Sequence, residues 1–403
     1  MSGMRVEPFE VAIPQASLDD LHRRLDATRR PDVPAGATGP EGPWQFGTDD
    51  AFLHDLADHW RHRYDWRAHE RAMNAWPHFL AQVPGPDGVE IPVHFIHAKG
   101  KGPNPLPLIL THGWPWTFWD LAEVIGPLTD PVAHGGDPAD SFDVVIPSLP
   151  GYCFSTPLPV PFLTTAQVAD LWVALMRGLG YERFCAQGGD WGAIVTIELG
   201  HAHSDVLHGI AVTMPSFPGA SRGPHAPEDL LPGEEDYAER TARRLRTASS
   251  HVAVMGTDPQ TLAHALHDSP VGLLSWLVER RRAWSDCEGP DGVRDVERRF
   301  SKDALCTLAS LYWHTGCFWS TERMYWGRVH VPWTSRHDRT PAVEAPTAMA
   351  VFPGDLIFVP RRVAERVANI QRWEVMPGGG HFAPAEEPGL VVGEVREFFR
   401  QFR

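Results

Sequence analysis

An aspartate stands at the centre of the segment QGGDWGA, residues 187–193, with small residues on both sides. This spacing is typical of a nucleophile elbow, where a strand turns sharply into a helix and exposes the central side chain. Serine is the usual occupant, whereas a carboxylate at Asp190 would attack a saturated carbon and form an alkyl ester. Asp190 could equally cap the helix that follows, so its role depends on the groups around it.

One upstream segment could stabilise charge beside this carboxylate. His112, Gly113 and Trp114 follow a predicted strand and should form the first strand-to-helix loop. Such a loop can offer the backbone N–H of Trp114, beside that of Trp191, to an oxyanion. The plainer interpretation is an ordinary Gly-Pro turn, but its place upstream of an elbow favours the oxyanion hole.

Two residues near the C-terminus could complete a catalytic triad. His381 follows a glycine run just before the last predicted helix, and Asp355 ends an earlier strand. This matches the order nucleophile, acid, histidine, with Asp355 orienting the imidazole. Taken alone, Asp355 could be a turn residue and His381 one of 21 mostly structural histidines. Together with the elbow and the oxyanion loop, they indicate a hydrolase with an aspartate nucleophile.

The elements that must position these residues alternate between strand and helix. Strand-like runs at 89–98, 106–114, 142–151 and 183–190 alternate with helical stretches such as 164–180, which predicts a mostly parallel sheet. Charged, Trp-rich helices follow up to about residue 335, before strand signals return at 347–355 and 372–379. The pattern predicts an α/β-hydrolase fold with an inserted helical cap. We place the two parts of the core at 91–218 and 341–403, and the cap at 219–340.

Residues 1–90 form a predicted N-terminal extension. Helix-period apolar spacing occurs at 17–30 and again at 51–66, with a Pro/Gly-rich loop at 31–43 between them. The whole stretch 7–80 therefore reads as helical.

Composition limits the partners of the chain. It has 403 residues, 43% of them hydrophobic, and a formal charge of −15, which disfavours nucleic acid and favours a small-molecule substrate. Without an apolar signal core or a long apolar run, we expect a cytoplasmic protein that does not enter membranes.

Five cysteines without CxxC spacing indicate neither a disulfide scaffold nor a zinc site, and no cofactor or metal is expected. All basic residues but three lysines are arginine, which suggests a GC-rich bacterial genome. The sequence is compatible with a homodimer and does not decide the oligomeric state.

Nearly the whole chain resembles the epoxide hydrolases that carry an epoxide hydrolase N-terminal domain, the microsomal-type branch of the α/β-hydrolase superfamily. The likeness rests on PFEVAIP and YDWRAHERAMNAWPHF in the extension, THGWP, PSLPGYCFS and QGGDWGA in the core, LYWHTGCFWSTERMYW in the cap, and FPGD and GGGHFAPAEEP at the end. The resemblance implies that Asp190 is the nucleophile, Asp355 the acid and His381 the base. It also implies that Tyr325 is one of two cap tyrosines that hydrogen-bond the epoxide oxygen.

The second cap tyrosine is missing. An ungapped comparison places His251 at its position, before the segment TDPQT at 257–261. Either His251 donates in its place, or Tyr325 acts alone, or a tryptophan indole assists; His251 could also be packing only. Because histidine titrates near neutrality, a donor role for His251 should change the pH dependence. Trp116 and Phe154 are the further residues that we expect to contact the substrate.

The function implied is hydrolysis of an epoxide to a vicinal diol through an aspartyl ester. Abundant tryptophan favours bulky or polycyclic natural-product epoxides, while detoxification is an equally compatible role. A haloalkane dehalogenase would share the elbow Asp190–Trp191, although Tyr325 and the extension argue against it. A ligand-binding relative with low turnover is the remaining alternative.

Overall fold

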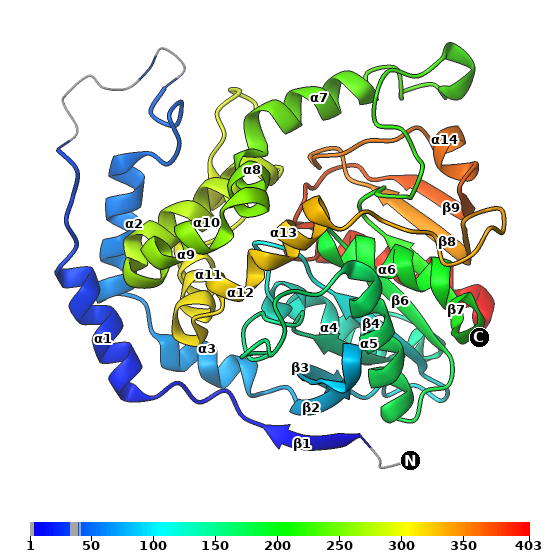
Figure 1. Cartoon of the computed structure of the whole chain (residues 1–403), viewed down its shortest axis with the longest axis horizontal. Helices are drawn as coiled ribbons and strands as arrows, with labels where there is room; N and C mark the ends of the chain where they lie inside the picture. Colours follow the sequence, from blue (N-terminus) through cyan, green and yellow to red (C-terminus); the bar gives the residue numbers. More distant parts are fainter. Residues whose placement is uncertain (1–3, 33–38, 40–41) are drawn as a thin grey trace.

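A nine-stranded sheet forms the centre of the computed structural model, which describes residues 4–32, 39 and 42–403 (Figure 1). Most of the loop predicted at 31–43 lies outside these residues. The order of the described strands is β1-β2-β3-β5-β4-β6-β7-β8-β9. Their bounds are Arg5–Phe9 (β1), His78–Pro84 (β2), Glu90–Ala98 (β3), Leu106–Thr111 (β4), Phe142–Pro147 (β5), Phe184–Gly188 (β6), Leu207–Val212 (β7), Val343–Val351 (β8) and Ala368–Val375 (β9).

Strands β4 to β9 pair in parallel, whereas the first four strands along one edge, β1-β2-β3-β5, pair antiparallel. The prediction of an α/β-hydrolase fold with a mostly parallel sheet is therefore confirmed. The carboxyl ends of the parallel strands meet at one edge of the sheet, which is where ligands bind in open α/β sheets.

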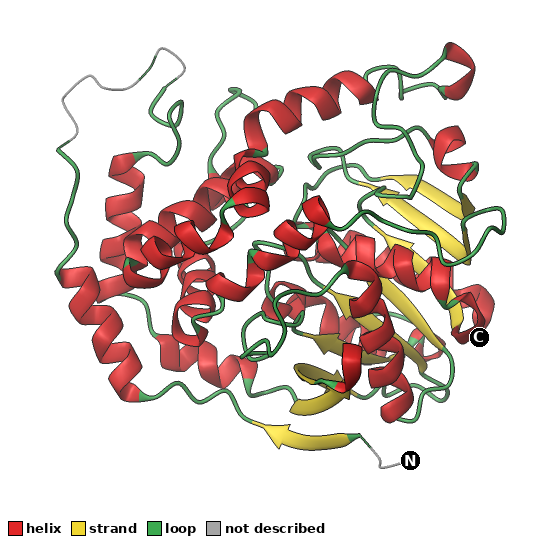
Figure 2. Cartoon of the chain, in the orientation of Figure 1, coloured by secondary structure: helices red, strands yellow, loops and turns green. Residues whose placement is uncertain are grey.

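Both faces of the central strands are buried, which explains their continuous apolar runs. In β4, Ile109 packs into one hydrophobic cluster while its neighbours Leu108 and Leu110 pack into the other. Helices α5 (Thr165–Gly178) and α6 (Trp191–Ala202) contribute to the first cluster, and α4 (Ala122–Thr129) and α16 (Pro388–Phe399) to the second. Figure 2 shows the sheet with helices around it. All five cysteines are free and buried.

Seven helices lie between β7 and β8 and form the cap beside the sheet (Figure 1). They are α7 (Tyr237–Ala248), α8 (Ser250–Thr257), α9 (Pro259–Asp268), α10 (Pro270–Trp284), α11 (Lys302–Thr315), α12 (Phe318–Thr321) and α13 (Arg323–His330). Two short helices, α14 (Arg361–Glu365) and α15 (Ala383–Glu386), belong to the second part of the core. No helix within the described part of the chain is both long and apolar enough to cross a bilayer.

The N-terminal extension is not wholly helical, contrary to the prediction for 7–80. It contains α1 (Gln15–Asp26), α2 (Asp50–His62) and α3 (Trp66–Met73), but β1 and β2 add two strands to the sheet edge. The boundary drawn at residue 90 falls at the first residue of β3, which pairs with β2. The extension therefore continues the sheet of the core.

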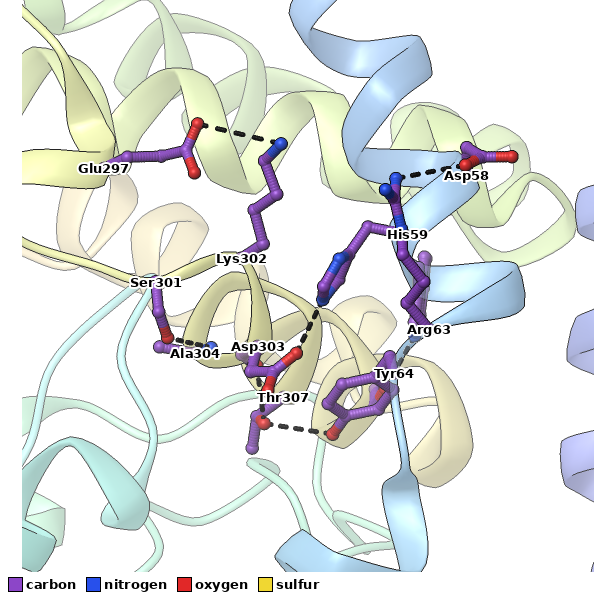
Figure 3. A network of polar contacts seen from close by, with 12 residues as sticks. Asp58, His59, Arg63, Tyr64, Glu297, Ser301, Lys302, Asp303, Ala304 and Thr307 are labelled. Atoms are coloured by element: carbon purple, nitrogen blue, oxygen red, sulfur yellow. Dashed lines mark hydrogen bonds and ion pairs between the residues drawn. The ribbon is translucent and has the colours of Figure 1, made fainter.

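Polar contacts join the extension to the cap (Figure 3). His59 on α2 lies 2.6 Å from the Asp303 carboxylate on α11, and the Tyr64 hydroxyl lies 3.0 Å from Thr307 Oγ1. Beside them the fully buried Trp60 donates its indole N–H to Ser310 Oγ at 2.9 Å. Buried hydrogen bonds between two elements fix their relative orientation, so the extension holds the cap against the core.

Candidate active site

The predicted triad residues meet where the parallel strands end. Asp190 follows β6, Asp355 follows β8, and His381 lies in the loop between β9 and α15. The loop after β4 brings Trp114 to the same place. Cap helices α8, α10 and α13 cover this edge with His251, Trp284 and Tyr325.

Asp190 sits in a backbone conformation that few non-glycine residues adopt. Its φ of 51° and ψ of −123° place it at the turn between β6 and α6. Such a conformation costs on the order of 1–3 kcal/mol and is found mainly at functional sites. The close packing requires glycines around it: a Cβ at Gly113 would collide with the Asp190 side chain, and one at Gly192 with the Thr111 carbonyl. The segment is therefore an elbow and not an ordinary helix cap, since no N–H of α6 is capped by the Asp190 side chain.

Each oxygen of the Asp190 carboxylate has its own neighbour. Oδ1 accepts the backbone N–H of Trp114 at 2.7 Å. Oδ2 lies 3.2 Å from His381 Nε2. The predicted oxyanion donor Trp114 is thus in contact with the carboxylate, while the role of the Trp191 N–H remains a prediction. Oδ1 is held by the backbone, and Oδ2 faces the imidazole.

Asp355 holds the other side of the His381 ring. Its Oδ1 accepts from His381 Nδ1 at 2.7 Å and from the Leu356 N–H at 2.6 Å. The ring is fully buried, and the indoles of Trp116 and Trp284 meet it edge-on at centroid distances of 5.6 and 5.1 Å. Because Nδ1 donates to Asp355, the other ring nitrogen, Nε2, faces Asp190.

Two carboxylates control the protonation of His381. Burial disfavours the imidazolium, but Asp355 and Asp190 outweigh it and raise the pKa of His381 to about 10. At neutral pH the resting site therefore contains an imidazolium between two carboxylates. Any event that removes the charge of Asp190 would lower this pKa.

Aromatic rings enclose the exposed side of Asp190. The Tyr325 ring packs edge-on to the indoles of Trp191 and Trp114, at 4.8 and 5.6 Å between centroids. Burial and the negative charge of Asp190 raise the pKa of Tyr325 well above its ordinary value. The phenol therefore stays protonated over the physiological range and is available as a donor.

His251 lies in this aromatic group, as the comparison with the missing tyrosine suggests. It stacks on Trp114 at 5.2 Å with an interplanar angle of 12°, and its centroid is 5.2 Å from that of Tyr325. Its Nδ1 is buried without a hydrogen-bond partner among the described residues. Burial and the charge of Arg280 lower the pKa of His251 to about 3. The expectation that it titrates near neutrality is therefore wrong, because a buried imidazole next to a guanidinium stays neutral.

Of the two further residues expected to contact substrate, only Trp116 lies at the site. It packs against His381 and against Gly189 of the elbow. Phe154 instead packs among Phe9, His94 and Phe118, with ring centroids 5.1 to 6.1 Å apart. Phe9, the last residue of β1, is one of these neighbours, and the role of Phe154 as a substrate contact stays a prediction.

Sequence reasoning missed three residues that support the site. Trp284 accepts the His381 backbone N–H at 3.0 Å and packs against both His381 and His251. Arg281, also on α10, donates to the Pro115 carbonyl at 3.2 Å and pairs with Asp120 at 2.6 Å, so it holds the Trp114 loop from the cap.

His112 is the third. Burial lowers its pKa to about 4, and the neutral ring donates to the Gly113 carbonyl and accepts the Leu149 N–H. These two hydrogen bonds fix the loop that presents the Trp114 N–H. Position in the motif THGWP was the only sequence signal for this role.

A cavity of about 210 Å³ is lined by Trp191, the residue that follows Asp190. Met324 and Gly327 of α13 line it from the cap, and Leu163 and Glu198 from the core. No group of three or more His, Cys, Asp or Glu side chains within the described ranges could hold a metal ion.

Fold and site define an α/β-hydrolase with an aspartate at the elbow. A family model described as alpha/beta hydrolase fold matches residues 107–388, and one described as Epoxide hydrolase N terminus matches residues 6–121. A Stigmatella aurantiaca protein named "Putative epoxide hydrolase" is 38% identical over 99% of this chain and 86% of its own length. Epoxide hydrolase 1 of Oryctolagus cuniculus is 31% identical over 98% of this chain and 88% of its own length. The chain belongs to the epoxide hydrolase family, as its motifs predict, and is a hydrolase.

Solved structures of epoxide hydrolases superpose on nearly the whole chain. The Aspergillus niger epoxide hydrolase superposes with a TM-score of 0.82 at 26% identity, covering 99% of this chain and 97% of the other. The juvenile hormone epoxide hydrolase of Bombyx mori superposes with a TM-score of 0.84 at 25% identity, covering 99% and 95%. The likeness includes the extension, because nearly the full length is covered.

The high pKa of His381 can be tested by titration. Replacing one carboxylate by an amide, as in Asp190→Asn, should lower the pKa of His381 from about 10 toward its ordinary value, because an imidazolium loses one of its two counter-charges. NMR titration of labelled histidine measures this directly. Asp303→Asn is the control, since Asp303 pairs with His59 and not with His381. An unchanged His381 pKa in Asp190→Asn would contradict the described electrostatics.

Proposed function

We propose that the protein hydrolyses an epoxide to a vicinal diol through an ester on Asp190. The observation that carries this proposal is the environment of one carboxylate: the Trp114 N–H donates to Oδ1 at 2.7 Å, and Oδ2 lies 3.2 Å from His381 Nε2. The charge of this carboxylate also acts on the buried phenol of Tyr325, whose ring packs edge-on to His251. A carboxylate nucleophile and neutral hydrogen-bond donors facing it are what the opening of an epoxide ring requires.

In the first step Asp190 Oδ2 attacks one ring carbon, and the carbon–oxygen bond of the oxirane breaks. The oxygen that leaves takes a proton from the Tyr325 phenol, which avoids a free alkoxide. His251 serves as a second, neutral donor through its unpartnered Nδ1. Oδ1 remains on the Trp114 N–H and becomes the carbonyl oxygen of the ester.

Formation of the ester turns His381 into a base. Alkylation removes the negative charge of Asp190, which is one of the two charges that raise the pKa of His381. The imidazolium can then transfer its proton to the Tyr325 phenolate that the first step leaves, either directly or through the newly formed alcohol. Neutral His381, still oriented by Asp355, takes a proton from water while the resulting hydroxide attacks the ester carbonyl.

The second step places negative charge on Oδ1. The Trp114 N–H is already directed at this atom, and the Trp191 N–H is the proposed second donor. Collapse of the tetrahedral species breaks the ester bond, and the departing alkoxide takes a proton from the His381 imidazolium to give the diol. The new carboxyl group returns its proton to His381, which restores the Asp190 carboxylate and the imidazolium.

The surroundings favour a flat apolar epoxide. Trp114, Trp191 and Trp284 supply aromatic faces around the candidate triad. Epoxides of aromatic or polycyclic natural products, and xenobiotic arene epoxides, share this chemistry. A haloalkane dehalogenase remains the alternative, because the buried indole N–H groups of Trp114 and Trp191 could hold a halide.

Blocking the second step should trap the ester. His381→Gln incubated with styrene oxide should gain the mass of the whole substrate on the peptide that contains Asp190, because attack by the carboxylate needs no base. Intact-protein and peptide mass spectrometry measure the increase. The same variant with 1-chlorobutane distinguishes the alternative, since a dehalogenase would gain only the butyl group and release chloride. An unmodified protein after exposure to a panel of epoxides would contradict the proposal.

The donors should act only in the first step. Tyr325→Phe should slow alkylation about 10²-fold, the usual contribution of a positioned general acid, while hydrolysis of the ester changes little. His251→Phe should also slow alkylation, and His251→Tyr should retain it. Because the pKa of His251 is about 3, its contribution should not vary between pH 5 and 8. Single-turnover kinetics separate the two steps. If His251→Phe alkylates as fast as the parent, His251 is packing and Tyr325 acts alone.

A further inference from the structure

A second cleft, of about 730 Å³, lies on the other side of α10 from the core. Residues 44–48 of the extension form one wall, and α7 and α10 of the cap form the others. Thr48 Oγ1 donates to the Ser275 carbonyl at 3.0 Å and ties the extension to α10 at the edge of the cleft. Asp190, Asp355, His381 and Tyr325 are not among its lining residues.

Arginine dominates the charge of this cleft. Arg244, Arg280, Arg282 and Arg294 line it, against the single acidic residue Glu279. This concentration of positive charge is unusual because the chain as a whole carries a formal charge of −15. A positive site on an acidic protein attracts anions selectively.

Two of the four guanidinium groups form no ion pair with the described residues. Arg280 pairs with Glu279, and Arg294 lies 3.5 Å from Glu288. Arg244 and Arg282 contact only backbone carbonyls or rings within the described part of the chain: Arg244 donates to Ala283 O at 3.4 Å, and Arg282 donates to Arg294 O at 3.2 Å. Burial, with repulsion from Arg294, lowers the pKa of both groups. A bound anion would relieve this unfavourable burial of like charges.

Aromatic rings lie beside the guanidinium groups. Arg282 stacks over Trp44 at 4.5 Å, and Arg280 over Trp276 at 4.8 Å. Phe46, which also lines the cleft, is 79% exposed, an unusual state for a large apolar side chain. These rings provide flat apolar surface next to the positive charge.

Hydrogen-bond donors in the cleft are also left without partners. Arg280 is only 4% exposed, yet its Nε has no acceptor among the described residues, and the same is true of the indole Nε1 of Trp276. Buried donors are nearly always paired, so unpaired ones mark a place where a ligand atom or water binds.

We propose that this cleft is a binding site for an anionic ligand with a flat apolar body, such as an aromatic carboxylate. The Arg244 and Arg282 guanidinium groups bind the anionic group, the Arg280 Nε and Trp276 Nε1 donate to it or to polar atoms beside it, and Trp44 and Phe46 cover the apolar body. The site shares no residue with the candidate triad, and one of its residues, Arg280, also lowers the pKa of His251 in the candidate active site.

Isothermal titration calorimetry with 2-naphthoate and neutral 2-naphthamide tests the site on the full chain. Naphthoate should bind at least about 10-fold more tightly than the amide, because charge-assisted hydrogen bonds are about twice as strong as neutral ones. Raising the salt concentration should weaken naphthoate binding and leave the amide little changed. Equal affinity for acid and amide would overturn the proposal.

Single substitutions test whether naphthoate binds in this cleft. Arg282→Gln and Arg244→Gln should each weaken naphthoate binding about 10-fold, whereas Arg282→Lys should retain part of the affinity because it keeps the charge. Arg246→Gln is the matched control: it removes the same charge from the exposed side of α7, outside the cleft, and should bind naphthoate like the parent. Melting temperatures confirm that each variant is folded. Naphthoate binding that is unaffected by Arg282→Gln and Arg244→Gln would place the ligand elsewhere and overturn the proposal.

Discussion

The position of the Asp190 carboxylate is the constraint on which the rest of the site depends. Its backbone is held at φ 51°, and each carboxylate oxygen has a separate neighbour, the Trp114 N–H on Oδ1 and His381 Nε2 on Oδ2. An elbow can hold this strain only because the glycines around it allow the backbones to approach and because the sheet and α6 on either side are fully packed. One oxygen is thereby held by the backbone of the Trp114 loop, while the other faces His381; in the proposed mechanism the first becomes the ester carbonyl oxygen and the second attacks the epoxide.

The cap and the extension act on this carboxylate from the opposite side. Arg281 on α10 holds the loop that carries Trp114, and Trp284 on the same helix holds the backbone and ring of His381. The extension in turn contacts α11 through His59 and Trp60. Low exposure strengthens the electrostatics at the site, which is why two carboxylates can raise the pKa of His381 while burial keeps His251 neutral. The two histidines thus differ in charge in the resting site: His381 is an imidazolium, whereas His251 is neutral.

Local sequence was sufficient to predict the triad and most of the sheet. Small residues around Asp190, a glycine run before His381 and apolar runs such as that of β4 are signals that lie within a few residues of what they position. Strands β1 and β2 lie in a segment for which the sequence predicts helix, and the sequence pattern does not predict β7. β1 pairs with β2, β2 with β3, and β7 with β6 and β8, so the strand structure of these short segments depends on partners outside each segment. The surroundings of Phe154 and the pKa of His251 could not be predicted, since both depend on what packs against these residues from elsewhere in the chain: β1 in one case and Arg280 in the other.

A single turnover in ¹⁸O-labelled water tests the central claim, attack by Asp190, most directly. With enzyme in excess over an epoxide, the hydroxyl added to the first diol should come from the Asp190 carboxylate and carry no label, while the peptide that contains Asp190 gains ¹⁸O because water attacks the ester carbonyl. Mass spectrometry of both products measures the distribution. Label in the diol and none in the Asp190 peptide would show that water attacks the epoxide itself and would contradict the account.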